Sequence, residues 1–527
     1  MAACNPSQLL PTKNLALESS TQLAYFKGDT SEPLMTGTVG QQLGQVCQDH
    51  PDNLALVFCE EDISWSFQQL NSKVSGLAAN LYDLGIRPGD RVGVFMSNYS
   101  PVCLLQLAAA RLGAIMVQFH ISFLVHELEY TLALTECKIL VVQPSYRATD
   151  CIQMLVQLIP ELQTCKANAL QSSRFPLLAS VLVADCSTMG AAGYHRLCPT
   201  NWRRMAGLTC FQTFASGRVN PATIEAIQQF NVKSIDPISI LFTSGSTGQP
   251  KPVTLSHFSV LNSGYFNHRR MGMTNQDIAC LSVPLYHCMG LVGGLFTLLT
   301  SGSARVIPSS IHISEATLKA LQTYRCTYYF GVGTMFADLL AHPNFDEFDL
   351  SSLARGVIGG SNCPASVKAE FIQRLGLTSL ISNYGMTETT YAAIMMPLGA
   401  AWEQMVQAEG QCLPYFEARI INSDTGKLAA VGEHGEVHLR SEYTMQYYWN
   451  EPEKTRQTKD SDDWIHTGDI AKFDSNGFCY VVGRKKDMII KGGENIFPGE
   501  IEKCLISHPN IRGVAVIGVQ QSAIEEE

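Results

Sequence analysis

The feature that most constrains the fold of this 527-residue chain is a repeated alternation of strand and helix patterns that begins at Thr38. Residues 91–96 and 114–118 are predicted strands, and a helix pattern at 101–112 lies between them. A strand, a helix and a second strand at this spacing form a parallel sheet with helices on its faces. The alternation resumes over residues 218–376. The predicted fold class is therefore α/β, with stacked mixed or parallel sheets.

The regions around this alternation have different patterns. Residues 1–37 are polar and irregular, which predicts a flexible arm, and residues 165–215 are predicted to be loop-rich. Short alternating strands around several glycines predict a small β subdomain at about 405–482. A short basic hinge after Gly483 leads into a final α/β piece, with a predicted strand at 513–519. A chain of this length is expected to form more than one lobe.

Composition excludes several classes of protein. The net charge is −10, and the richest basic cluster, at 484–486, is cut short by Asp487, so we expect no nucleic-acid partner. The 17 cysteines include no C-x-x-C pair, which argues against a zinc site or disulfide framework and for a reducing compartment. The longest apolar run, near residues 290–299, is too short to cross a bilayer, so we expect no integral membrane protein. The N-terminus has no secretory signal and is poor in Arg for a mitochondrial presequence.

A glycine- and hydroxyl-rich loop predicts a phosphate-binding site. It follows a predicted strand at 238–242, and its glycines let backbone N–H groups approach an anion while the hydroxyls and the lysine add donors and charge. The spacing does not match a Walker A loop. The alternative is a flexible turn between two strands. The loop consists of Thr243, Ser244, Gly245, Ser246, Thr247, Gly248, Gln249, Pro250 and Lys251.

Two further motifs are compatible with a ligand site. His287 lies between an aromatic residue and a glycine, where an imidazole could line or gate a pocket, although an interior histidine is the simpler interpretation. Gly359, Gly360 and Ser361 follow a predicted strand, and a double glycine there permits close approach of a ligand. The alternative for this second motif is an ordinary turn between a strand and a helix.

The stretch at 382–389 carries more specific chemistry. Asn383, Tyr384 and Gly385 end a predicted strand, and the tyrosine ring could stack on a base. Thr387 could donate to a phosphate oxygen, and Glu388 offers a hard oxygen ligand for Mg²⁺. The alternative is a strand end whose polar residues open a helix.

Three short motifs follow in the C-terminal part. Asp469 stands just past a predicted glycine turn, where a carboxylate could accept both hydroxyls of a ribose. Arg484 and Lys486 belong to a basic run, and Gly492 and Gly493 follow an apolar strand. The alternatives are a Gly-Asp turn and a charged surface hairpin.

Taken together and in this order, the motifs resemble the acyl-adenylate-forming (AMP-binding) superfamily, which includes acyl-CoA synthetases, firefly-type luciferases and peptide-synthetase adenylation domains. Within it the chain is most similar to medium-chain acyl-CoA synthetases, on residues 284–290 and 487–502. The resemblance covers roughly residues 38–520. The six motifs are 243–251, 284–290, 359–364, 382–388, 464–469 and 483–487.

The resemblance implies a fatty acid–CoA ligase that uses ATP, Mg²⁺ and coenzyme A. A fatty carboxylate would first form acyl-AMP and pyrophosphate, and CoA would then displace AMP. The resemblance implies catalytic roles for Thr243, Lys251, His287, Thr387 and Glu388, with Glu388 as the Mg²⁺ ligand.

The resemblance also implies the nucleotide contacts. The loop 243–251 would grip the β- and γ-phosphates, Tyr384 would stack on adenine above Gly359 and Gly360, and Thr387 would reach the α-phosphate. Ser361, Asn383 and Gly385 would complete this part of the pocket. Asp469 and Arg484 would clamp the ribose. Lys486 would lie at the hinge of a mobile lid, and Gly492 and Gly493 would face the pantetheine tunnel.

The implied domains are an AMP-binding domain at 38–485 and a truncated C-terminal lid at 486–527. Only 41 residues follow Lys486, and the lid lysine used in adenylation is absent, so we expect impaired adenylation. A non-catalytic nucleotide- or acyl-binding protein, such as a splice product or incomplete gene model, is the alternative. The resemblance places the protein in the mitochondrial matrix, with the cytoplasm as alternative; oligomeric state and acyl chain length stay open.

Overall fold

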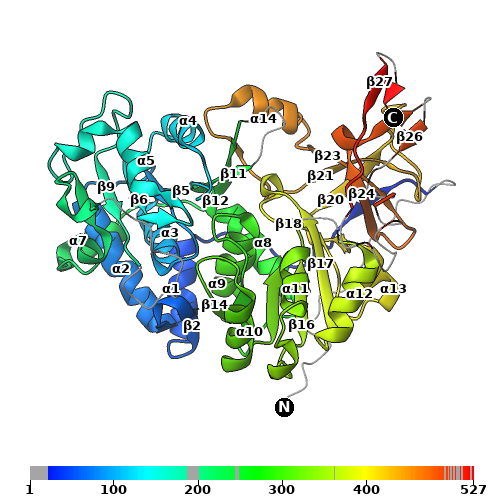
Figure 1. Cartoon of the computed structure of the whole chain (residues 1–527), viewed down its shortest axis with the longest axis horizontal. Coiled ribbons are helices and arrows are strands. Elements are labelled where there is room, and N and C mark those ends of the chain that lie inside the picture. The colour runs from blue at the N-terminus through cyan, green and yellow to red at the C-terminus, as the bar shows by residue number, and fades with distance from the viewer. Residues whose placement is uncertain are drawn as a thin grey trace.

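The computed structural model describes residues 22–186, 201–243, 249–360 and 363–491, and, beyond these, 494–496, 498, 501–502, 505, 511, 514–522 and 525–526. Three large sheets build the molecule, and helices lie between and outside two of them (Figure 1). Within the described residues, no helix is both long and apolar enough to pass through a membrane.

The first sheet has eight strands and is mostly parallel. In spatial order its strands are β10 (Leu208–Cys210), β9 (Ser180–Val183), β6 (Ile139–Val142), β4 (Arg91–Phe95), β5 (Ile115–Gln118), β11 (Pro237–Thr243), β12 (Lys251–Ser256) and β22 (Tyr447–Tyr448). Only the pairs β11–β12 and β12–β22 are antiparallel. Residues 165–215, predicted to be loop-rich, thus contribute β9 and β10, because the apolar run at β9 is completely buried against β6.

The second sheet has nine strands. Their order is β19 (Gln411–Cys412), β18 (Ala392–Met395), β17 (Ser379–Gly385), β16 (Arg355–Ile358), β15 (Tyr328–Gly331), β13 (Ile278–Leu281), β14 (Ala304–Ile307), β2 (Leu54–Phe58) and β3 (Ile63–Ser66). The early strands β2 and β3 therefore complete a sheet whose other members come from far along the chain. The strand β2 pairs in parallel with β14, and Leu56 lies opposite Arg305.

The third sheet takes most of its strands from the region of the predicted β subdomain, and its first strand from residues 25–27, inside the predicted flexible arm. Its five strands are β1 (Tyr25–Lys27), β20 (Glu417–Ile421), β21 (Gly435–Arg440), β23 (Ile465–Phe473) and β24 (Cys479–Arg484), all antiparallel. The arm prediction is therefore wrong for residues 25–27, because β1 is held by antiparallel pairing with β20 and Phe26 is buried in the central cluster. Two-stranded ribbons are formed by β7 (Ser145–Tyr146) with β8 (Thr149–Asp150), β25 (Ile489–Lys491) with β26 (Glu494–Ile496), and β27 (Gln520–Ser522) with β28 (Glu525–Glu526).

The helices divide into a central and two outer layers. The main central helices are α1 (Val39–Asp49), α2 (Phe67–Asp83), α3 (Ser100–Leu112), α8 (His257–Met271) and α9 (Thr297–Ser301). The outer helices include α4 (Val125–Thr135), α5 (Cys151–Leu158), α10 (Ser314–Thr323), α11 (Gly333–Leu340) and α12 (Ala365–Arg374). The remaining helices are α6 (Phe211–Ala215), α7 (Pro221–Gln228), α13 (Trp402–Gln407) and α14 (Pro452–Thr458).

Alternation of side chains along the strands explains the layers. In β4, Val94 belongs to the central apolar cluster, whereas the next residue, Phe95, packs in the cluster outside the sheet. In β2, Leu56 faces the centre and Val57 faces the outer helices. Because successive side chains point to opposite faces of a sheet, strands covered by helices on both sides must be apolar throughout. The predicted α/β class is confirmed.

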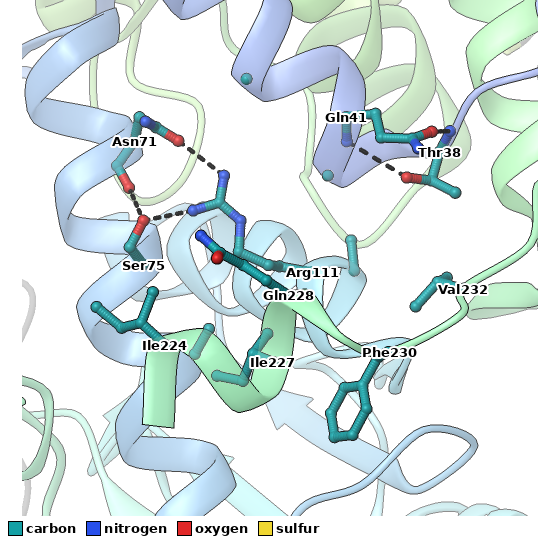
Figure 2. Close-up of a pocket in the computed structure, with 14 residues that line it drawn as sticks. Thr38, Gln41, Asn71, Ser75, Arg111, Ile224, Ile227, Gln228, Phe230 and Val232 are labelled. Atoms are coloured by element: carbon teal, nitrogen blue, oxygen red, sulfur yellow. Dashed lines mark hydrogen bonds between the residues drawn. The ribbon is translucent and has the colours of Figure 1, made fainter. Parts of the chain in front are cut away.

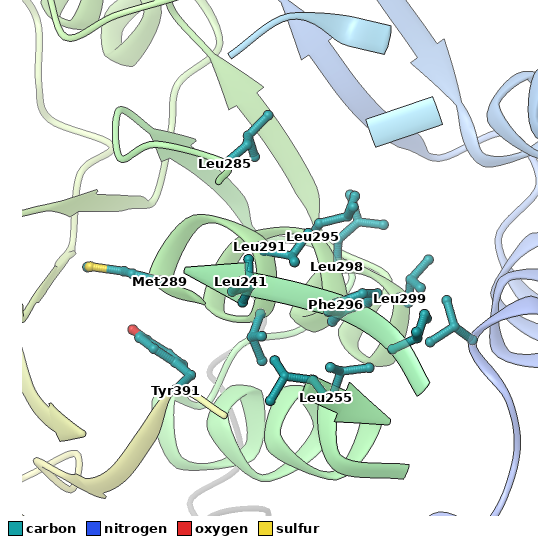
Figure 3. Close-up of a cluster of buried hydrophobic side chains, with 14 of the residues drawn as sticks. Leu241, Leu255, Leu285, Met289, Leu291, Leu295, Phe296, Leu298, Leu299 and Tyr391 are labelled. Atoms are coloured by element: carbon teal, nitrogen blue, oxygen red, sulfur yellow. The ribbon is translucent and has the colours of Figure 1, made fainter. Parts of the chain in front are cut away.

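The central cluster joins both sheets into one core. Figure 3 shows part of it, with Leu241 of β11 and Leu255 of β12 packed in the same cluster as Leu298 of α9. A π-helix, η6 (Met289–Phe296), leads directly into α9, so the apolar run near 290–299 is an interior helix.

The prediction of a strand at 513–519 is wrong for the residues of this segment that the structure describes. Residues 514–519 lie outside any strand, and Ile517 is 75% exposed. In the described part of the chain no strand pairs with this segment, so its β-branched residues have no sheet to join. Residues 1–21 of the predicted arm lie outside the described residues, and the boundary between 38–485 and 486–527 stays a prediction.

Candidate active site

Several predicted residues lie where strands of the two large sheets end. Thr243 ends β11, Gly359 follows β16, and β17 ends at Gly385. The strand β11 runs parallel to β5, and β17 runs parallel to β16. In sheets of this kind, ligands bind beyond the carboxyl ends of the strands.

The hairpin of β11 and β12 brings the two ends of the predicted phosphate loop together. Thr243 and Lys251 are direct cross-strand partners. Gln249 is exposed and Pro250 is buried, whereas Ser244, Gly245, Ser246, Thr247 and Gly248 lie outside the described residues. The Nζ atom of Lys251 lies 5.3 Å from the ring centre of Tyr448, which places its positive charge over an aromatic face.

Glu388 is buried, and its carboxylate interacts with Lys251, Tyr448 and Thr243. Tyr448 donates a hydrogen bond to its Oε1, while its Oε2 is buried without a hydrogen-bond partner among the described residues. Burial raises the pKa of Glu388, and Tyr448, Lys251 and Thr243 counteract that rise by favouring the carboxylate. A carboxylate with one unused oxygen beside a lysine and a threonine hydroxyl fits a hard cation.

The described residues contain no cluster of three or more His, Cys, Asp or Glu side chains placed to hold a metal. A single carboxylate is nonetheless compatible with Mg²⁺, because this ion usually keeps several waters and is bound by one or two carboxylates plus substrate phosphates. Glu388 could therefore bind a cation whose other ligands are water molecules and substrate phosphates.

A cavity of about 200 Å³ opens beside the end of β17. It combines glycines, one aromatic ring and charged side chains, and most of these residues lie in or next to strands of the second and third sheets. The lining residues are Gly360, Asn383, Tyr384, Gly385, Glu409, Asp469, Val481, Gly483 and Arg484.

Three of these side chains form a linked group. The hydroxyl of Tyr384 donates to Asp469 Oδ2 over 2.8 Å, and the Nε of Arg484 lies 3.5 Å from Asp469 Oδ1. Asp469 and Arg484 are cross-strand partners in β23 and β24. Burial raises the pKa of Asp469, and Tyr384 and Arg484 oppose this rise. The site thus holds a carboxylate that retains capacity to accept further hydrogen bonds.

The glycine before Asp469 does not form the predicted turn. Gly468 lies inside β23 with φ +71°, close to a register shift between β21 and β23. A left-handed residue within a strand marks a bulge, which re-aims the following side chain. The bulge therefore explains how the carboxylate of Asp469 reaches Tyr384.

Gly359 is required by close packing under the cavity. A Cβ atom at this position would overlap the side-chain amide of Asn383. That amide is held in place because its Nδ2 donates to the carbonyl oxygen of Ile358 over 2.9 Å. Of the predicted glycine pair, Gly359 thus has no room for a side chain, whereas Gly360 has room but a left-handed backbone with φ +80°.

His287 lies in an aromatic group near the end of β11. Its ring centre is 4.8 Å from that of His120, which also lies beside Tyr286 and Phe123. Although part of the His287 residue is exposed, desolvation of its imidazole by neighbouring atoms lowers its pKa to about 4, and His120 adds to the effect. The imidazole is therefore neutral near pH 7. Thr387, the predicted α-phosphate donor, is buried in this structure.

Some predicted residues are not part of this arrangement. Lys486 lies on the short helix η9 (Lys485–Asp487) and is exposed, while its neighbour Lys485 is 2.9 Å from Glu436. Ser361, Gly492 and Gly493 lie outside the described residues. Sequence reasoning missed Tyr448 and Glu409, because neither stands in a glycine-rich or charged motif.

The family follows from comparison with known proteins. Residues 43–449 match the family model described as AMP-binding enzyme. The chain belongs to the AMP-binding enzyme family. The match spans most of the chain and includes the β11–β12 hairpin and Glu388, while Asp469 and Arg484 lie beyond it.

Individual members of the AMP-binding enzyme family resemble the chain over most of its length. The mitochondrial medium-chain acyl-CoA ligase ACSF2 of Mus musculus is 35% identical over 96% of this chain and 80% of its own length. The putative acyl-CoA synthetase YngI of Bacillus subtilis is 34% identical over 94% of this chain and 87% of its own. The crystal structure of ATP-bound MatB from Rhodopseudomonas palustris superposes with a TM-score of 0.78 at 25% identity, covering 93% of this chain and 87% of MatB.

These findings confirm the predicted superfamily and the similarity to medium-chain acyl-CoA synthetases. They also confirm that the chain is an AMP-binding enzyme of the AMP-forming acid–CoA ligase type. The individual residue roles stay predictions.

Proposed function

We propose that the protein is an AMP-forming acid–CoA ligase that activates a medium-chain fatty acid. The observation that carries the proposal is the cavity in which Tyr384, Asp469 and Arg484 converge. Tyr384 stands on the same short stretch of chain as the buried carboxylate of Glu388. The names of ACSF2 and YngI support acyl-CoA formation, and ACSF2 supports the medium-chain acid.

In the first half-reaction a carboxylate oxygen of the fatty acid attacks the α-phosphorus of ATP. The new O–P bond forms as the bond to the bridging oxygen of the β-phosphate breaks, and pyrophosphate leaves with the electron pair. The protein contributes mainly by positioning and by stabilising charge on the phosphoryl oxygens. Lys251, with the loop that precedes it, would supply positive charge at the phosphates, and Thr387 would donate to the α-phosphate.

The nucleoside would occupy the cavity of about 200 Å³. Tyr384 offers its ring to the adenine, and Asp469 with Arg484 offers an acceptor and a donor to the ribose hydroxyls. Mg²⁺, held by Glu388, would neutralise charge on the triphosphate. His287, neutral near pH 7, would line the boundary with the acyl group.

In the second half-reaction the sulfur of coenzyme A attacks the acyl carbonyl carbon. A C–S bond forms as the bond between the acyl carbon and the phosphate oxygen of AMP breaks. AMP leaves with the electron pair on that oxygen, and the thiol proton passes to solvent. We propose that the region from Lys486 onward approaches this site, as the resemblance implies for the lid and for Gly492 and Gly493.

The experiment is a panel of fatty acids of increasing chain length, assayed with the purified chain for AMP release with and without CoA. We expect release that depends on both acid and CoA, with the highest kcat/KM for a medium-chain acid such as octanoate. ATP–pyrophosphate exchange in the same samples isolates adenylation and measures whether it is slow in the 527-residue chain. ATP binding without exchange or AMP release would instead favour the non-catalytic alternative.

Matched carboxylate variants test the metal site. Glu388→Gln removes the charge of the buried carboxylate and should lower the exchange rate at least tenfold, because one charge-assisted contact contributes about 1.5–3 kcal/mol. Glu417→Gln is the control, since Glu417 pairs with Arg440 at 2.8 Å on the third sheet and does not line the cavity. Equal rates for the two variants would contradict the assignment.

We also propose the mitochondrial matrix as the compartment, supported by the mitochondrial ACSF2 relatives. A C-terminally tagged full-length chain should colocalise with a matrix marker in cells; diffuse cytoplasmic signal would favour the alternative.

A further inference from the structure

A second cavity, of about 410 Å³, lies between α1, α2, α3 and α7 (Figure 2). It is remote from the candidate active site. Arg111, which lines it, stands at the end of α3, just before the amino end of β5. Thr243 stands at the carboxyl end of β11, which runs parallel to β5. The two sites therefore lie at opposite ends of the parallel strands β5 and β11.

Arg111 is a positive charge without a carboxylate partner among the described residues. Its guanidinium donates to Ser75 Oγ and, over 2.7 Å, to Asn71 Oδ1. No Asp or Glu is among the described residues that line the cavity. A guanidinium carries five N–H donors, so two hydrogen bonds leave donors for a further acceptor. Figure 2 shows Arg111 beside Gln228 in the middle of the cavity lining.

The first turn of α1 adds to the positive potential. Thr38 caps this helix, and the side chain and backbone of Gln41 complete the capping box. Gly40 and Gln41 line the cavity, and the first turn contains no acidic residue. The amino end of a helix carries a partial positive charge, which favours an anion nearby.

The opposite wall is apolar. Ile224 and Ile227 project from α7, and Phe230 and Val232 continue the wall (Figure 2). On α1, a Cβ atom at Gly44 would meet no other atom within 4 Å, so the helix leaves open space there. A guanidinium without a carboxylate partner among the described residues, opposite an apolar wall, suits a molecule with one anionic end and one apolar end.

We propose that this cavity binds a small carboxylate with an apolar chain, with the carboxylate on Arg111 and the chain along α7. Arginine recognises a carboxylate through two parallel N–H···O bonds, and the cavity volume falls within the range of about 300–1,000 Å³ typical of ligand pockets. This inference concerns a site separate from the proposed reaction and does not depend on it.

The test uses methyl NMR of the full chain labelled at isoleucine δ1-methyl groups. Ile224 and Ile227 are assigned by single Ile→Val substitutions. Hexanoate is the probe, 1-hexanol is the uncharged control, and inorganic phosphate is the anion without an apolar chain. We expect saturable shifts of both methyl signals with hexanoate and none with the other two.

Two variants localise the effect. Arg111→Met removes the charge but keeps a similar apolar stem, and should weaken hexanoate binding about tenfold or more. Gly44→Leu fills the open space without removing the bonds of Arg111, and should also abolish the shifts. The dispersion of the remaining methyl signals verifies that each variant is folded.

Several results would overturn the proposal. No shift with hexanoate, equal shifts with 1-hexanol, or equal shifts with phosphate would each contradict an amphipathic carboxylate site. Shifts that persist in both variants would assign the effect to binding elsewhere. Because none of these signals depends on AMP release, failure here is distinguishable from failure of the proposed ligase activity.

Discussion

Lys368→Met is expected to destabilise the protein by breaking a buried ion pair beside the cavity of about 200 Å³. The Lys368 side chain, on α12, is 2% exposed, and its Nζ lies 3.2 Å from Oε1 of Glu409, which lines the cavity. Methionine preserves most of the volume of the lysine but removes its charge. The substitution therefore leaves the largely buried Glu409 carboxylate without its partner.

The expected loss follows from that burial. Breaking a buried ion pair by removing one partner lowers the free energy of unfolding by about 3–5 kcal/mol. For a chain of 527 residues, an unfolding entropy of about 2.1 cal/mol/K per residue makes 1 kcal/mol equivalent to about 1 °C in Tm. Lys368→Met should therefore lower Tm by about 3–5 °C. The double variant Lys368→Met/Glu409→Gln should recover most of this loss, because no uncompensated charge remains.

The assay is differential scanning calorimetry of both variants and the parent chain. Lys319→Met is the matched control, because Lys319 and Glu315 form an even shorter pair, at 2.6 Å, but on an exposed surface. Exposed pairs contribute little to stability, so this control should leave Tm unchanged. The reasoning is refuted if both lysine variants lose the same stability, or if the double variant is no more stable than Lys368→Met.

Three further outcomes are expected. Tyr384→Phe keeps the ring but removes the hydrogen bond to Asp469, so the KM for ATP should rise about tenfold in the exchange assay. The KM for the fatty acid should change less. Gly385→Ala should lower the free energy of unfolding by about 1–3 kcal/mol in urea titrations, since its Cβ would overlap a backbone carbonyl, whereas Gly483→Ala, where a Cβ meets nothing within 4 Å, should not. Burial lowers the pKa of His257 to about 4 in the folded protein, below its value of about 6.5 in the unfolded chain. As the pH falls, the unfolded chain therefore binds a proton before the folded protein does, and the free energy of unfolding should fall by about 3 kcal/mol between pH 6.5 and 4. His257→Asn should flatten that fall, and an unchanged pH profile would contradict the assignment.

The fold could be predicted from periodicity because local pattern and tertiary environment agree. The predicted strand at 91–96 and helix at 101–112 appear as β4 and α3 within one residue at each end. The segment 514–519 has equally strong apolar residues, but the described chain gives it no sheet to join. Strand propensity decides a structure only where a neighbouring strand is present.

The candidate site could be predicted in part, because its glycines and charges stand in compact motifs. The pairing of Asp469 with Tyr384 could not, since it depends on a bulge at Gly468 and on contact between two sheets. Tyr448 was missed for a similar reason: the edge strand β22 brings it to Lys251 from nearly 200 residues away, and nothing in its own neighbourhood indicates this. Sequence motifs thus reveal side chains that act within one loop better than those joined only by tertiary packing.

The position of β2 beside β14 has a consequence for synthesis of the chain. The register partner of Leu56 is Arg305, so β2 must wait for about 250 further residues, or roughly 12–50 s at about 5–20 residues per second, before its partner strand exists. Throughout that interval the hairpin of β2 and β3 lacks the neighbour that will cover its apolar edge. A slow translation step or a chaperone that binds extended apolar segments would act on this hairpin before any other part of the nine-stranded sheet can form.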